Sequence, residues 1–240
     1  LHDRDKRVLA AAIDVLKGIA PVEVMERLLQ ISHRSNAEWR WFAATELEDY
    51  LPQPAIVDRL VELTKDGDWT VRFYAAQTLT GAAFDSKVRK RLLDLLVDAD
   101  SSVRRVAAQA LEPLFSQEDV RNRLVELARS PRGELRDIAA LTLAGAVSRP
   151  EAVKLLLELA NDREWYVRYT AAEALVGAIS DPIVDSELLR LIEDNDPGVR
   201  EAVLRGLCTW AKPIPRALLR RVVRLARQDS GAWEALEILA

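Results

Sequence analysis

The chain has 240 residues, 49% of them hydrophobic, and its 34 basic and 38 acidic side chains give a net charge of −4. This composition can build a continuous core, and the balanced charge gives no overall field that favours nucleic acid or anionic lipid. The one cysteine, Cys208, excludes an internal disulfide. No apolar run reaches the roughly 18 residues of a membrane span, and the charged start is unlike a secretory signal. We therefore expect a cytoplasmic protein.

Taken in chain order, the first part of the sequence predicts a series of short helices. Pro21 suits the first turn of a helix, where the missing N–H would have no partner, and Pro52 and Pro54 break the chain before the next one. The predicted helices cover residues 3–17, 22–31, 39–50, 55–64 and 69–82. Nowhere does an alternation of apolar and polar residues extend beyond a few positions, so we predict no sheet.

One layout then recurs along the chain. An arginine returns every 32 residues. A pair of small residues follows it three and four positions later, and a leucine seven positions later. The arginines are Arg40, Arg72, Arg104, Arg136, Arg168 and Arg200. A fixed period in this range indicates a solenoid, in which each repeat packs only on its neighbours.

Each repeat also carries signals for its two helices. In the first helix a leucine pair such as Leu60 and Leu63 recurs at the same period, which places the pair on one helical face. In front of the second helix stands a capping residue, four positions before the arginine. These caps are Asn36, Asp68, Asp100 and Asp196, with Glu164 as a poorer one. Arg132 breaks the pattern, and Ser130–Pro131 predicts a start two residues earlier.

The arginines flank the apolar face of the second helix, close to the acidic turn of an adjacent repeat. We expect them to bind acidic side chains or turn carbonyls there. We interpret the series as a structural ladder and not as a binding site.

The layout D-x-D-x-x-V-R-x-x-A-A-x-x-L resembles the HEAT repeat, in the short bacterial form called phycobilisome-lyase-like. Residues 66–79 match it throughout, whereas Val203–Leu204 replaces the alanine pair in the last clear repeat. The match covers about residues 36–210, with degenerate units at 1–35 and 211–240. The resemblance implies an all-α protein, a right-handed superhelix of about seven antiparallel helix pairs whose second helices line the concave side. We expect one array over residues 1–240.

The resemblance says little about function, because the family includes scaffolds, adaptors, lyase subunits and a few enzymes. The sequence starts at Leu1 and ends within an apolar pattern at Ile238–Leu239. We therefore expect a fragment of a longer bacterial protein.

Residues that the repeat does not dictate are the candidates for binding. Aromatic side chains occur at outward-facing positions of the second helix and at its start, where they form a plausible recognition row. This row consists of Trp41, Trp69, Phe73, Trp165 and Tyr169. The alternative is that these rings cover helix ends or pack between repeats. We favour packing for Trp39, Phe42 and Tyr74.

A second candidate surface is basic. Four arginines fall on one face of the last long helix, at Arg216, Arg220, Arg224 and Arg227. This face could bind an acidic partner or a phosphate backbone. The alternative is a solvated helix face at the end of the array.

The sequence contains no recognisable set of catalytic residues. His2 and His33 are the only histidines, so neither a histidine cluster nor a Ser-His-Asp set can be assembled. Cys208 has no base near it in the sequence. The single glycines Gly81, Gly145 and Gly177 stand at helix ends and form no phosphate loop. We expect no enzyme activity, no metal and no cofactor.

These observations predict a scaffold or adaptor that binds another protein on the concave face. Two alternatives stay open. One is a nucleic-acid-binding protein, similar to DNA glycosylases, that uses the basic C-terminal region. The other, which rests on the resemblance alone, is a bilin-lyase-type chaperone subunit.

Overall fold

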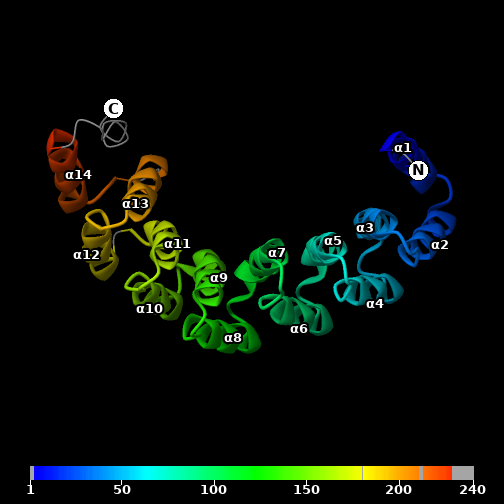
Figure 1. Ribbon diagram of the computed structural model, residues 1–240, viewed down its shortest axis with the longest axis horizontal. Helices are drawn as coiled ribbons and strands as arrows, with labels where there is room; N and C mark the ends of the chain where they lie inside the picture. Colours follow the sequence, from blue (N-terminus) through cyan, green and yellow to red (C-terminus); the bar gives the residue numbers. More distant parts are fainter. Residues whose placement is uncertain (1–2, 180, 211–212, 229–240) are drawn as a thin grey trace. The chain divides into compact units, whose positions relative to one another are not determined.

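A computed structural model describes residues 3–179, 181–210 and 213–228. Within these ranges every regular element is helical (Figure 1), which confirms the all-α solenoid class. The chain divides into two compact units, residues 1–110 and 111–240, and each is described by itself. The single array over residues 1–240 and its right-handed superhelix stay predictions.

The first unit contains alternating helices of two layers. We call the first helix of each repeat the A helix and the second the B helix. In Figure 1 the A helices α2, α4 and α6 lie side by side, and the B helices α3, α5 and α7 form the second layer. The bounds are α1 Asp3–Lys17, α2 Pro21–Ser32, α3 Ala37–Glu46, α4 Pro54–Leu63, α5 Trp69–Leu79, α6 Ser86–Leu95 and α7 Ser101–Leu111.

The second unit repeats this arrangement, with A helices α8, α10 and α12 and B helices α9, α11 and α13. The bounds are α8 Glu118–Ala128, α9 Gly133–Leu143, α10 Pro150–Leu159, α11 Trp165–Val176, α12 Pro182–Leu191, α13 Pro197–Thr209 and α14 Arg216–Gln228. The sequence also predicts an insertion of about two residues near positions 212–215, because Leu225 stands two positions beyond the phase of the leucine series. Residues 211–212 lie outside the described residues.

Several B helices end earlier than predicted. α5 stops at Leu79 and continues as a 3-10 turn, Thr80–Ala82, and α3 likewise stops at Glu46 before Glu48–Tyr50. The tighter i to i+3 bonds of a 3-10 turn satisfy carbonyls that an ending α-helix leaves open. The apolar pattern continues through both forms, so periodicity alone did not distinguish them.

The predicted caps start most of the B helices. Asn36, Asp68 and Asp196 each accept a hydrogen bond from the backbone amide two positions on, at 2.8 Å. Asp100 does the same for α7. The early start predicted at Ser130–Pro131 is wrong. The Ser130 hydroxyl accepts from the amide of Arg132, which forms a turn, and α9 begins at Gly133.

The core of each unit is built from the small pairs and leucines of the repeat. Ala75, Ala76 and Leu79 are fully buried, as are their counterparts in the second unit, Ala171, Ala172 and Leu175. The alanines leave room for neighbouring B helices to approach, and burying one leucine contributes about 1.5–3 kcal/mol.

Candidate protein-binding surface

Four of the six ladder arginines, two in each unit, bind an aspartate of the following repeat. In the first unit, Arg72 places Nε at 2.9 Å and Nη2 at 2.8 Å from the two carboxylate oxygens of Asp98. The Nη1 group of Arg72 also donates to the carbonyl of Asp66, in the turn before its own helix. The other bidentate pairs are Arg40–Asp66, Arg136–Asp162 and Arg168–Asp194. Each pair thus ties two consecutive repeats together and fixes a turn.

These contacts shift the pKa values of the aspartates. Burial alone raises the pKa of Asp98, but the hydrogen bonds from Arg72 and from the amide of Asp100 outweigh burial, so the pKa is lowered below its ordinary value. Asp66, Asp162 and Asp194 show the same net direction for the same reasons. Each of these carboxylates already accepts hydrogen bonds from an arginine and a backbone amide of the chain itself. We therefore assign the aspartates a structural role and not a ligand-binding one.

Two ladder arginines differ from this pattern. Arg104 and Arg200 use Nη1 for the carbonyls of their own turns, as the others do. The buried Nε of Arg104, however, has no hydrogen-bond partner. The paired aspartates stand 26 positions after their arginines, and the residues at that distance from Arg104 and Arg200 are Ser130 and Ala226. The expected ladder is therefore incomplete.

A second set of arginines, on the A helices, was missed from the sequence. Arg59 donates to the hydroxyl and carbonyl oxygens of Ser32, at the end of the preceding A helix. Arg91 binds Thr64 in the same way, with its Nε 2.8 Å from the hydroxyl oxygen. A cation there also complements the negative end of the helix dipole. The 32-residue spacing of Arg59 and Arg91 was a visible signal.

In the first unit, the predicted binding aromatics lie on the B helices. The Trp41 ring stacks on Tyr74 with 4.9 Å between ring centroids, and Phe73 meets Tyr74 edge-on at 5.2 Å. All three side chains are half-buried. Tyr74, which we assigned to packing, therefore belongs to the same cluster as the two predicted binding residues. Trp69, at the first position of α5, is 47% exposed. The unit therefore presents a packed aromatic cluster and one open tryptophan.

Trp39 and Phe42 behave differently. Both are buried, and they pack edge-to-face with centroids 6.0 Å apart. Both are therefore core residues, in agreement with the packing that we predicted for them.

The second unit presents Trp165, Tyr166 and Tyr169 on α11. Trp165 is 50% exposed and meets Tyr166 edge-on, with centroids 5.9 Å apart. The Tyr169 hydroxyl donates to Glu173 at 2.8 Å, and this bond, followed by burial, raises the pKa of Tyr169. Burial is the main reason why the pKa of Tyr166 is raised, and nearby Glu164 adds to it.

Carboxylates therefore surround the aromatics of α11. Besides Glu164 and Glu173, the charges of Glu134 and Asp137 act on Tyr166, and that of Glu201 acts on Tyr169. Arg205 is the cation beside Tyr169, and it forms an ion pair with Glu201. Arg163 forms an ion pair with Glu164, and the charge of Arg136 also acts on Tyr166, so this part of the surface combines aromatic rings with charges of both signs.

The basic candidate lies on α14. Arg216, Arg220 and Arg224 are exposed on this helix, whereas the side chain of Arg227 lies outside the described residues. Arg221, beside them, forms an ion pair with Glu193. The described part of the patch is thus a solvated row of three guanidinium groups.

No catalytic constellation is found in the described part of the chain. No three His, Cys, Asp or Glu side chains among these residues are grouped to hold a metal ion. His33 is exposed in the turn after α2, Cys208 is exposed on α13, and His2 lies outside the described ranges. Across the residues described, no helix is long and apolar enough to cross a membrane.

Stacked antiparallel helix pairs, tied by arginine–aspartate pairs, define an α-solenoid repeat protein. A profile described as HEAT repeats matches residues 25–112 and 121–208, which is more than half of the chain. The chain belongs to the HEAT repeat family, and the predicted resemblance is confirmed. None of the curated proteins matches the chain.

Solved structures agree with this fold. The complex of CpcE and CpcF of phycocyanin lyase from Nostoc sp. PCC7120 is 20% identical, with a TM-score of 0.51, over 90% of this chain and 92% of that one. YIBA_ECOLI is 16% identical, with a TM-score of 0.54, over 96% of this chain and 94% of that one. At these identities the likeness shows the fold alone.

Proposed function

We propose that this protein is a non-catalytic scaffold that binds a protein partner on the B-helix face. The observation that carries this proposal is the pair of exposed tryptophans, Trp69 and Trp165, at the first position of α5 and α11. The same position in the other repeats holds Ala37, Ser101, Gly133 and Pro197. Packing of the repeat therefore requires no large ring there, and exposed tryptophans are typical anchors of interfaces.

The surroundings of the second tryptophan favour a basic partner segment. On the same helix as Trp165, the charge of Glu164 acts on Tyr166, and those of Glu173 and Glu201 act on Tyr169. A cation placed over an exposed aromatic face gains about 0.5–1 kcal/mol. A lysine or arginine on the partner would meet both the ring and the carboxylates. Tyr169 would border this contact, because it is half-buried and already bonded to Glu173. In the first unit, Trp41 and Phe73 would border a contact at Trp69, because both are half-buried and pack on Tyr74.

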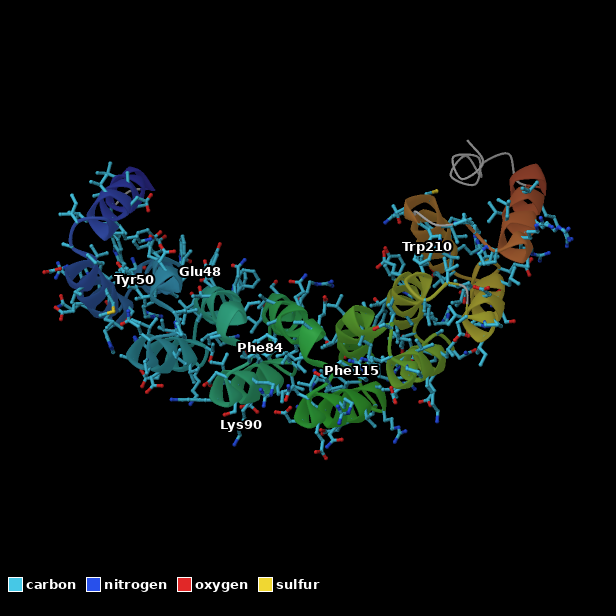
Figure 2. The ribbon with its side chains drawn as sticks, turned by 180° about the vertical axis from the view of Figure 1, so that it is seen from behind. Glu48, Tyr50, Phe84, Lys90, Phe115 and Trp210 are labelled. Atoms are coloured by element: carbon cyan, nitrogen blue, oxygen red, sulfur yellow. The ribbon has the colours of Figure 1, made fainter. Side chains whose placement is uncertain are left out.

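Site-specific photo-crosslinking in living cells tests the proposal. A photoreactive phenylalanine analogue at position 69 or 165 should yield a discrete crosslinked protein. The control position is Lys90, which points outward from the A helix α6 (Figure 2) and should yield none. Equal crosslinking at all three positions would show nonspecific contact and reject the B-helix face.

Alanine variants separate binding from packing. Trp165→Ala should weaken capture of the crosslinked partner while the helical circular dichroism signal and melting temperature stay nearly unchanged, because half of this ring is in solvent. A large loss of stability would instead make Trp165 a packing residue.

The alternatives have simple tests of their own. Nucleic-acid binding through Arg216, Arg220 and Arg224 predicts salt-dependent retention on heparin, and no retention would remove it. A bilin-lyase-type role predicts quenching of tryptophan emission by added bilin. No contact in the structure favours either over protein binding.

A further inference from the structure

Two cavities on the A-helix side of the second unit occupy the same place in consecutive repeats. One has a volume of about 290 Å³ and the other about 770 Å³. The smaller is lined by Phe115, Ser116, Arg121, Arg149 and Glu151. Each of these has a counterpart 32 positions on in the larger cavity, namely Val147, Ser148, Val153, Asp181 and Ile183. The two cavities are therefore the same site of the repeat, lined by different side chains, and they can be compared residue by residue.

In the smaller cavity an arginine of the chain itself fills the site. The Nη1 group of Arg121 donates to the backbone carbonyls of Phe115 and Ser116, in the turn before α8. In the first unit, Arg89 occupies the equivalent position and donates to the carbonyl of Phe84 at 3.1 Å. Both turns, marked by Phe84 and Phe115 in Figure 2, therefore have a guanidinium as their partner.

In the larger cavity this arginine is missing. Val153 stands at its position, and its apolar side chain cannot donate to the carbonyls of Val147 and Ser148 as Arg121 does to those of Phe115 and Ser116. Ile183 replaces the exposed Glu151 and is itself 67% exposed, which is unusual for isoleucine at the start of a helix. Its counterparts in α6 and α8 are Lys87 and Asp119.

The charge of the site also reverses. Arg149 of the smaller cavity becomes Asp181, so Arg121, Arg149 and Glu151 are replaced by one aspartate and two apolar side chains. At these positions a net positive charge becomes a net negative one. Lys154 and Glu158, further along the rim, offset each other.

We propose that the cavity between α10 and α12 binds an arginine side chain of a protein partner, in the place that Arg121 takes within the chain one repeat earlier. The guanidinium would donate to the carbonyls of Val147 and Ser148 beside Asp181, and its methylenes would cover Val153 and Ile183. The larger volume leaves room for an apolar side chain next to the arginine, against Leu157. This site is on the A-helix side and is independent of the B-helix face.

The probe is the tripeptide N-acetyl-Leu-Arg-Leu-amide, titrated into the full chain with methyl-labelled valine and isoleucine. Saturable shifts of the Val153 and Ile183 methyl signals are expected. The citrulline form of the peptide, which has the same shape without the charge, should bind at least about fivefold more weakly. Equal binding of the two peptides, or no saturable shift up to about 10 mM, would overturn the proposal.

Two variants copy residues between the repeats, so each replacement already fits this fold. Val153→Arg should fill the site from within and weaken peptide binding at least about tenfold, with no loss of helicity. The triple variant Arg121→Val, Arg149→Asp, Glu151→Ile should create a second site and raise the stoichiometry to two. Undiminished binding by Val153→Arg would show that the peptide binds elsewhere and would refute the assignment.

Discussion

At the scale of single residues, the cohesion of this protein depends on guanidinium geometry. Arg72 uses three nitrogens at once, two on Asp98 and one on the turn of its own repeat. A lysine ammonium carries one charge on a flexible stem and cannot reproduce that fork. The pair is largely buried, with 14% and 10% of the two side chains exposed, so an imperfect replacement has a cost.

Arg72→Lys should therefore lower the free energy of unfolding by about 1–2 kcal/mol, measured by urea denaturation. Arg104→Lys is the matched control, because Arg104 binds only turn carbonyls and its Nε has no partner. We expect a loss of about 0.5 kcal/mol or less there. Equal losses at both positions would mean that the carboxylate contributes nothing.

The same pairs make stability depend on pH. The pKa values of Asp66, Asp98, Asp162 and Asp194 are lowered in the folded state, so the unfolded chain binds protons first. Their contribution is complete above the unfolded value of about 3.9 and is lost as the pH falls below it. Asp98→Asn should be less stable near neutral pH and lose less stability between about pH 5 and pH 3 than the parent. An unchanged pH profile in Asp98→Asn would contradict this account of the pairs.

At the scale of elements, the side chains at one contact between α11 and α13 compensate each other in size. A Cβ built on Gly206 of α13 would come within 2.6 Å of a methyl carbon of Val176 on α11. One repeat earlier the corresponding residues are Ala144 and Ala174, so a valine–glycine pair replaces two alanines. The helix spacing is thus kept by compensation within the pair.

Gly206→Ala should cost about 1–3 kcal/mol through this overlap, in spite of the better helix propensity of alanine. Val176→Ala in the same chain should recover most of the loss, because it recreates the alanine pair of the preceding repeat. A double-mutant cycle by thermal or urea unfolding measures the coupling. Purely additive effects would show that the two side chains do not meet.

How much of this could be read from the sequence differs with the kind of interaction. The periodicity predicted the helices, their caps and the arginine series, because each depends on residues close in the chain. The missing ion pair of Arg104 was also predictable, because position 130 holds a serine where four of the other repeats have an aspartate. Ring contacts such as Trp41 on Tyr74 were not, since they depend on side-chain angles between helices. The cavity at Val153 needed the structure to show that the replaced arginine leaves space.

At the scale of the whole molecule, a repeat array stabilises each unit through its neighbours, so damage should stay local. Asp98→Ser, which copies the residue found at position 130, removes the carboxylate that binds Arg72 but keeps a hydroxyl acceptor for the amide of Asp100, as Ser130 provides for Arg132. Native-state hydrogen exchange should then report a loss of about 2–3 kcal/mol in α5 and α7, where the pair is broken. The amides of α12 and α13 should change by less than about 0.5 kcal/mol, because none of their contacts is altered. An equal loss throughout would mean that the chain unfolds as one cooperative body, and the nearest-neighbour description would be wrong.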